Sequence, residues 1–327
     1  MKIYQILIVY FFCHIISSVS FANENKKIDI FSTPLKLNPI DINQKEIGKL
    51  EYISGFELNS NERFFGGLSG LSINSKMELF SVTDRGVWFK SPINLDSKGK
   101  LIEIKQFETG VLKNIYGEFI DLDKSDSDAE AIEIDENGHF LISFERNHRV
   151  LKYKDLSKTP EVIIPPTALN SLPFNGGVES FIPITQNKLF LITEDKINKN
   201  SNIEAFIFNN NKLSALELNK TGIFKPTDLS NLANGDLLLL ERSFTPIMGP
   251  AARISLIEKE KIIPGQTLIP TELATIRPPL MVDNFEGIAV VGTPSEGYFI
   301  FVISDDNFKP VQRTLLMQFY WDGITEN

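Results

Sequence analysis

Five segments of the chain place a short apolar stretch between two polar ends, and most of these ends are carboxylates. Two of these segments read DAEAIEIDENGHFLISFER (128–146) and GVESFIPITQNKLFLITED (177–195). The others cover 66–85, 226–242 and 284–306. Carboxylates that converge from several segments could bind a hard cation or take a proton in hydrolysis. The leading positions are Ser69, Glu130, Glu179, Asp228 and Glu286, and the trailing positions are Asp84, Glu145, Glu194, Glu241 and Asp305.

A cation would relieve the repulsion between such acids if their segments meet. Ca²⁺ accepts about six to eight oxygen ligands in flexible geometry. Raised carboxylate pKa values and neighbouring arginines are two other ways to relieve it. A purely structural role for each acid, in solubility or in hydrogen bonds to loops, also remains open. On the first interpretation we expect Ca²⁺ ligands among Glu130, Glu179, Asp228, Glu286, Asp84 and Asp305.

The trailing acids and the arginines that follow three of them suggest hydrolysis of an anionic ester. We assign the general base to the group Glu145, Glu194 and Glu241. Arg can hold a phosphate or a carboxylate through two parallel hydrogen bonds. A metal ion beside it would polarise an oxygen and activate water. We therefore expect the ligand-binding cations to be Arg85, Arg146 and Arg242.

Other catalytic patterns are weak. Ser69 lies in GGLSGL, which is not the G-x-S-x-G nucleophile motif. His139 and His148 lack zinc-site spacing and favour strand-end or surface roles. The sequence has no phosphate-binding loop and no dinucleotide-binding fingerprint.

The stretches between the polar ends are typical of β-hairpins in a repeated fold. Two copies centre on Asn137-Gly138 and Asn234-Gly235, pairs that favour a tight turn with positive φ at both residues. Each leading residue should then lie opposite its trailing partner. The leading positions are 61, 49, 49 and 58 residues apart, a period that indicates an all-β propeller rather than the competing β-sandwich. We expect six blades, the sixth formed by strands near both termini, 50–58 and 314–321.

The start of the chain resembles a signal peptide. Residues 1–22 combine one lysine, an apolar run and a small-residue end, although an uncleaved anchor is the alternative. Residues 23–48 would form an arm and 49–327 a single domain. Cys13, the sole cysteine, lies in the leader, so the mature chain has no disulfide or thiolate metal site. The net charge of −9 disfavours nucleic acid as a partner. We expect a periplasmic or secreted monomer that binds a small-molecule substrate and no membrane.

Several of these motifs together resemble the bacterial phytase-like family, described as having esterase-like activity of phytase. The resemblance runs from about Phe65 to Phe319, through FGGLSGLSI, SVTDRG, DAEAIEI, ISFERNHRV and NGGVES to DNFEGIAV and ISDDNFKPVQRTLLMQF. It implies a role for the repeated acids, Asp306 included. The first copy departs from the pattern at Ser69. A propeller phytase would also line its site with several lysines, where this chain carries arginines.

Three functions follow. The first is an exported, Ca²⁺-dependent phosphoester hydrolase. The second is a Ca²⁺-dependent lactonase or carboxylic esterase of the propeller type. The third is a non-catalytic propeller that binds a ligand through its acids.

Overall fold

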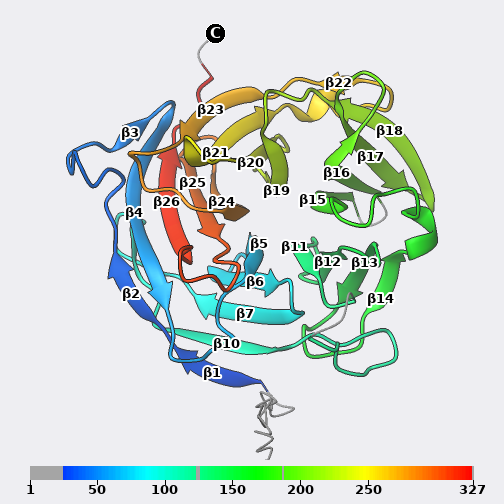
Figure 1. Cartoon of the computed structure of the whole chain (residues 1–327), viewed down its shortest axis with the longest axis horizontal. Helices are drawn as coiled ribbons and strands as arrows, with labels where there is room; N and C mark the ends of the chain where they lie inside the picture. The colour runs from blue at the N-terminus through cyan, green and yellow to red at the C-terminus, as the bar shows by residue number, and fades with distance from the viewer. Residues whose placement is uncertain (1–24, 123–125, 186–187, 326–327) are drawn as a thin grey trace, which may run out of the picture.

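The chain folds into a ring of five β-sheets, or blades, arranged around a central axis (Figure 1). This computed structural model describes residues 25–122, 126–185 and 188–325. The proposed signal peptide, 1–22, lies outside the described residues. The described segments include no apolar helix of the length that a bilayer span requires.

Each blade is a mostly antiparallel sheet whose first strand lies nearest the axis. From the axis outward, blade 1 contains β5 (Leu68–Ile73), β6 (Glu78–Thr83), β7 (Val87–Pro92), β10 (Gln106–Val111) and β1 (Lys26–Asp29). Blade 2 contains β11 (Ala129–Ile134), β12 (Phe140–Phe144), β13 (Arg149–Tyr153) and β14 (Glu161–Ile164). Blade 3 contains β15 (Val178–Thr185), β16 (Lys188–Ile197), β17 (Ile203–Asn209), β18 (Lys212–Leu218) and the parallel β22 (Thr267–Leu268).

The last two blades complete the ring. Blade 4 contains β19 (Lys225–Asn231), β20 (Leu237–Thr245), β21 (Gly249–Ile257) and β23 (Thr271–Ile276). Blade 5 contains β24 (Phe285–Thr293), β25 (Gly297–Ser304), β26 (Leu315–Trp321), β4 (Leu50–Asn59) and β2 (Phe31–Pro34), with β3 (Glu46–Ile47) beside β4. Outside the blades are β8 (Asn94–Leu95), which pairs with β9 (Leu101–Glu103), and 3₁₀ turns at Pro166–Ala168 and Lys259–Lys261.

The prediction of six blades was wrong, although the expected closure by strands from both ends is confirmed. The two segments assigned to a sixth blade, β4 and β26, pair with each other and continue the sheet of β24 and β25. They are therefore the outer strands of blade 5. Each inner strand contacts the next one around the axis, and β24 contacts β5, which closes the ring. Residues 26–59 thus supply outer strands to blades 1 and 5 and form no blade of their own.

The blades are held together by apolar side chains on both of their faces. Five clusters of buried residues each fill the space between two neighbouring blades. On β20, Leu237 and Leu239 pack toward blade 3, whereas Leu238 and Leu240 pack toward blade 5. This burial on both faces explains the unbroken apolar runs in the sequence, because alternate side chains of a strand point to opposite faces.

The two Asn-Gly hairpins form as expected, but with a different turn. Only the glycine has positive φ: 78° at Gly138 and 89° at Gly235. The Gly138 N–H donates to the Asp135 carbonyl, and the Gly235 N–H donates to the Leu232 carbonyl. The asparagines instead occupy the position before the glycine in a four-residue turn. The prediction of positive φ at both residues was therefore wrong.

Candidate functional site

The inner strands begin, and the second strands end, at one end of the ring, which we call the acidic end. Near its start each inner strand has a β-bulge, at Ser69/Leu71, Ala129/Ile132, Val178/Ser180, Pro226/Asp228 and Phe285/Gly287. A bulge inserts an extra residue into one strand of a pair and redirects the side chains beside it. The expected direct opposition of leading and trailing residues is therefore wrong. The trailing residue lies instead across from a residue that precedes the leading one.

The pairing registers define three equivalent positions in the five blades. The Glu145 N–H donates to the Asp128 carbonyl, and Glu194 and Asp305 make the same bond to Gly177 and Asn284. From blade 1 to blade 5, the trailing positions are Asp84, Glu145, Glu194, Arg242 and Asp305. The leading positions are Ser69, Glu130, Glu179, Thr227 and Glu286. The opposite positions, which lie across from the trailing ones, are Gly67, Asp128, Gly177, Lys225 and Asn284. In blade 4, Thr227 and Arg242 thus replace Asp228 and Glu241, which the sequence suggested for these positions.

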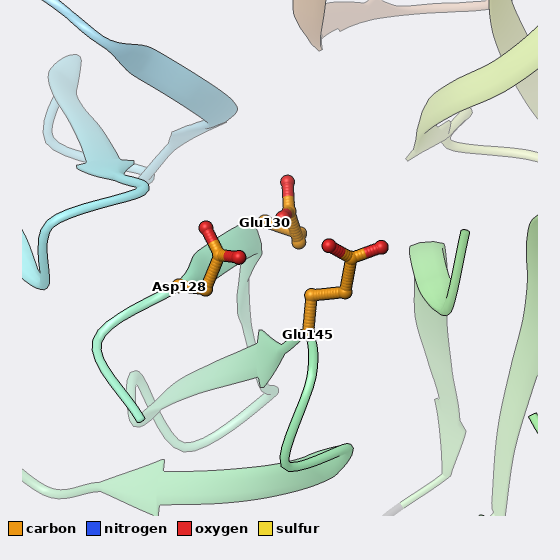
Figure 2. Close-up of side chains that lie close together, drawn as sticks. All are labelled: Asp128, Glu130 and Glu145. Atoms are coloured by element: carbon orange, nitrogen blue, oxygen red, sulfur yellow. The ribbon is translucent and has the colours of Figure 1, made fainter. Parts of the chain in front are cut away.

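Blade 2 is the blade in which all three positions are acidic. Each of Asp128, Glu130 and Glu145 offers a carboxylate oxygen, and these oxygens lie within 4.8 Å of one another. Figure 2 shows the three side chains gathered at the start of β11 and the end of β12. We call these residues the acidic triad. Two oxygens on opposite sides of a Ca²⁺ ion are about 4.8 Å apart, because each Ca–O distance is about 2.4 Å. The triad could therefore hold one cation.

The triad is short of positive partners. Among the described residues, the Glu130 carboxylate has no hydrogen bond or ion pair. Asp128 Oδ2 lies 2.9 Å from Arg146 Nε but receives no well-directed hydrogen bond. One Glu145 oxygen accepts the N–H groups of Gly176 and Gly177, the latter at 3.2 Å. These remaining acceptor sites and the all-carboxylate donor set fit a hard divalent cation.

Burial and mutual repulsion shift the titration of the triad. Burial raises the pKa of Asp128 to about 7, while Arg146 lowers it and Glu145 raises it further. The pKa of Glu130 is held well above its ordinary value by burial and then by the charges of Glu179, Asp128 and Glu145. A bound cation would oppose both effects, because it favours the ionised carboxylates.

Blade 4 supplies two cations, Arg242 and Lys225, at this end. Arg242 Nη2 lies 3.1 Å from a Glu194 oxygen in blade 3, and Arg242 Nε lies 3.0 Å from a Glu286 oxygen in blade 5. Lys225 Nζ also lies 3.5 Å from Glu194. Arg242 thus compensates an acid in each of the two neighbouring blades, and its own pKa is raised mainly by Glu286.

The remaining acids still outnumber the cations. Glu179 is 6% exposed and has no hydrogen bond or ion pair among the described residues. Its pKa is held well above its ordinary value by burial, Glu194 and Glu286. Burial also raises the pKa of Glu286 to about 7 and that of Asp305 to about 8. Asp84 shows the same direction of shift, with burial as its main cause.

The structure places two of the sequence-predicted residues elsewhere. Asp228 lies one residue beyond the leading position, and its carboxylate accepts the N–H groups of Leu229 at 2.9 Å, Ile288 at 2.8 Å and Leu71 at 3.3 Å. It thereby ties inner strands of blades 1, 4 and 5. Glu241 lies one residue before the trailing position and binds Arg253 through both oxygens, each at 2.7 Å.

Two other predicted arginines do lie at the acidic end. Arg146 contacts Asp128 while 40% of its side chain remains exposed. Arg85 stacks on the Phe308 ring, with its guanidinium carbon 3.7 Å from the ring centroid. Asp306, which the family resemblance included, accepts the Gly67 N–H at 2.9 Å and holds the loop beside blade 1.

The serine and the histidines show no catalytic arrangement. Ser69 is buried. His139 contacts Asp135 at the hairpin turn of blade 2, and His148 Nε2 lies 2.7 Å from the Pro173 carbonyl oxygen.

Asp128 and Lys225 lie at the site but are not among the residues predicted from the sequence. Asp128 opens the segment 128–146, but an acid at its position does not recur in the other copies. The other blades carry glycine, lysine or asparagine at its position. The available indication was its place two residues before Glu130, where the cross-strand pairing brings it opposite Glu145.

Several solved structures resemble this chain at low sequence identity. An α-L-arabinofuranosidase from Podospora anserina in complex with cellotriose is 10% identical, with a TM-score of 0.48 over 91% of this chain and 98% of that one. A luciferin-regenerating enzyme is 12% identical, with a TM-score of 0.43 over 88% and 95%. A putative gluconolactonase is 10% identical, with a TM-score of 0.39 over 90% and 100%. Likenesses at this level carry no argument about activity.

The sequence comparison is more specific. No curated protein matches the chain. The phytase-like family, described by the esterase-like activity of phytase, matches residues 63–308, which include the triad, Arg242 and all five inner strands. The resemblance found in the sequence is thereby confirmed, and the chain belongs to the phytase-like family.

Proposed function

We propose that this protein is a Ca²⁺-dependent hydrolase that cleaves a phosphoester at the acidic end of the ring. The observation that carries the proposal is the acidic triad, whose oxygens lie within 4.8 Å of one another beside the partly exposed Arg146. Without a cation, the surplus of carboxylates would repel an anionic substrate. A bound Ca²⁺ would offset most of the triad's negative charge where the substrate arrives, and Arg146 would offset the remainder.

The residues of the site would divide the work between binding and proton transfer. Asp128, Glu130 and Glu145 would hold the ion, which would supply Lewis acidity toward a phosphoryl oxygen and a water molecule. Arg146 contacts Asp128 through Nε. Its remaining N–H groups would donate hydrogen bonds to a second phosphoryl oxygen.

Glu194 is the proposed general base, because its ion pairs with Arg242 and Lys225 use only one of its oxygens. By contrast, Arg253 binds both oxygens of Glu241, and one Glu145 oxygen already accepts two backbone N–H groups. Glu194 would take a proton from the attacking water. The new P–O bond would form as the ester P–O bond breaks, and the alcohol would leave with a proton from solvent. We do not include Glu241 or Asp228 in the proposed set.

A second candidate is a Ca²⁺-dependent lactonase or carboxylic esterase. It is favoured by the contacts of Arg242. This side chain already contacts Glu194, Glu286 and Asn284, so few of its N–H donors remain for a phosphate. In that case the ion would polarise a carbonyl, and Arg146 would contribute little. Export to the periplasm or outside, and a monomeric state, stay part of the proposal.

The first experiment measures thermal unfolding of the full chain in EDTA and in millimolar Ca²⁺. We expect Ca²⁺ to raise the Tm by several degrees, since a ligand that binds only the folded state stabilises it. Glu130→Gln should abolish this increase. Glu136→Gln is the matched control, because Glu136 is an exposed acid at the opposite end of blade 2. An equal Ca²⁺ effect in all three proteins would reject the triad as the site.

Activity assays then separate the two reactions. Hydrolysis of phosphomonoesters, lactones and carboxylic esters is measured in Ca²⁺ for the wild type and for Arg146→Met. A phosphoester hydrolase should lose at least about tenfold in kcat/KM, since a charge-assisted contact contributes roughly 1.5–3 kcal/mol. A lactonase should be nearly unaffected. Ca²⁺ binding without any hydrolysis would instead favour a binding propeller.

A further inference from the structure

A cleft of about 880 Å³ lies between blades 4 and 5 and reaches the acidic end. Such a volume falls in the range of small-molecule binding sites. Arg242, Asn284 and Glu286 line its inner part. Much of the remaining wall is apolar and includes Phe244, Pro278, Pro279, Leu280, Met281 and Val311.

The apolar wall is open to solvent. Phe244 is 69% exposed and Val311 is 86% exposed, although both are large apolar side chains. They come from different blades, one from β20 and the other from the segment between β25 and β26. Exposed apolar side chains gathered from separate elements around one cleft indicate a binding surface.

The cleft reaches the proposed general base. Arg242 and Glu286 line its inner part and lie 3.0 Å from each other. Arg242 also lies 3.1 Å from Glu194, the proposed general base. The cationic side chains of Lys309 and Arg313 also line the cleft, and Arg313 contacts Asp283 at 3.4 Å. An occupant of the cleft would therefore have its inner end next to the proposed reaction site.

We propose that this cleft binds the apolar part of an amphipathic phosphoester, whose phosphate group lies at the acidic end. The inference rests on the proposed function and names its substrate class: monoesters of alcohols with an alkyl or aryl group. A fully phosphorylated inositol is anionic on all sides and would leave the apolar wall unused. The walls thus favour an ester with a separate apolar group over phytate.

The test measures binding of phosphonates, which cannot be hydrolysed, to the full chain in millimolar Ca²⁺ by calorimetry. Hexylphosphonate and methylphosphonate share the charged group and differ only in apolar length. We expect hexylphosphonate to bind at least about tenfold more tightly, since each buried methylene contributes roughly 0.8 kcal/mol and only part of the chain needs to be buried. Equal affinity for the two compounds would overturn the inference.

Two variants locate the apolar contact. Phe244→Ser should reduce the preference for the hexyl compound at least about threefold. Ile247→Ser is the matched control, because Ile247 is 96% exposed on the same hairpin and does not line the cleft. Equal effects of the two substitutions, or none from Phe244→Ser, would place the alkyl group elsewhere and overturn the assignment.

Hydrolysis is measured separately with hexyl phosphate. Preferred binding of hexylphosphonate without any turnover of hexyl phosphate would contradict the proposed function while keeping the apolar cleft as a binding site. Turnover of methyl and hexyl phosphate at equal kcat/KM would support the function and overturn the inference. Absence of binding by both phosphonates would overturn the two together.

Discussion

Arg242 occupies in blade 4 the position that Glu145 occupies in blade 2, as the pairing of the first two strands of each blade establishes. Because blade 4 carries a cation where blade 2 carries an acid, the acidic end divides into two parts. On one side Arg242 compensates Glu194 and Glu286 directly. On the other side, Arg146 is the one cation among the described residues that forms an ion pair with the triad. Blade 2, whose three equivalent positions are all acidic, is the blade where an external cation fits.

Replacing Arg242 should therefore destabilise the protein. Arg242→Met leaves Glu194 and Glu286 without their main partner in a crowded set of acids. Breaking a buried ion pair costs about 3–5 kcal/mol, and the partial exposure of Arg242, 32%, reduces this to roughly 2 kcal/mol. Denaturant unfolding at neutral pH in EDTA measures the change.

Arg277→Met serves as the control for this experiment, since Arg277 is exposed and has no ion pair among the described residues. It should change the free energy of unfolding by less than about 0.5 kcal/mol. A similar loss in both variants would show that the contacts of Arg242 with the two glutamates contribute little.

Asp128 should be required for cation affinity. Asp128→Asn removes one charge from the triad while keeping an oxygen in place, and charge is a main determinant of Ca²⁺ affinity. We expect the dissociation constant for Ca²⁺, measured by calorimetry, to increase at least about tenfold. Asp126→Asn makes the same chemical change two residues away at an exposed side chain and should leave the affinity unchanged. Equal affinities for all three proteins would exclude Asp128 as a ligand.

Much of this architecture was predictable from local patterns. Apolar runs such as 237–240, bounded by polar ends, indicated strands buried on both faces, and their regular spacing indicated a propeller. The gathering of Glu130, Glu145, Glu179, Glu194, Glu286 and Asp305 at one end also followed from the repeat.

The blade number and the alignment of the fourth copy depended on contacts that the sequence does not display. Strands β4 and β26 lie far apart in the chain, and only their pairing shows that they belong to blade 5. In the fourth copy, Asp228 and Glu241 imitate the repeated acids but are each displaced by one position, in opposite directions. A one-residue displacement turns a side chain to the other face of a strand. Only the observed pairing of Pro226 with Glu241 reveals it.

The raised pKa values predict that the metal-free protein loses stability as the pH rises. The pKa of Asp305 is raised from 3.8 to about 8, and that of Glu286 from 4.5 to about 7. Between the unfolded and folded values the native state binds more protons than the unfolded state, so the free energy of unfolding falls with increasing pH. The stabilising contribution is complete below about pH 4 and is lost by about pH 8.

Unfolding in EDTA between pH 5 and 8.5 checks this dependence. The Tm should fall over that range, and Asp305→Asn should weaken the fall because asparagine does not titrate. Asp322→Asn is the control, since Asp322 is an exposed acid beyond the last strand. A Tm that rises with pH in the wild type, or an identical slope in Asp305→Asn, would contradict the assignment.

Glu241 should be essential for stability but not for catalysis. Its two oxygens bind Arg253 at 2.7 Å, and both side chains are almost fully buried, with exposures of 3% and 8%. Glu241→Gln leaves the guanidinium buried without a charged partner, which should cost about 3 kcal/mol in unfolding free energy. The double substitution Glu241→Leu with Arg253→Met removes both charges and should recover part of that loss.

Ca²⁺ affinity and kcat of the folded fraction should remain unchanged in Glu241→Gln. By contrast, Glu194→Gln should reduce kcat by about a hundredfold or more with a smaller effect on stability. Loss of kcat in Glu241→Gln at wild-type stability would show that Glu241 takes part in the reaction.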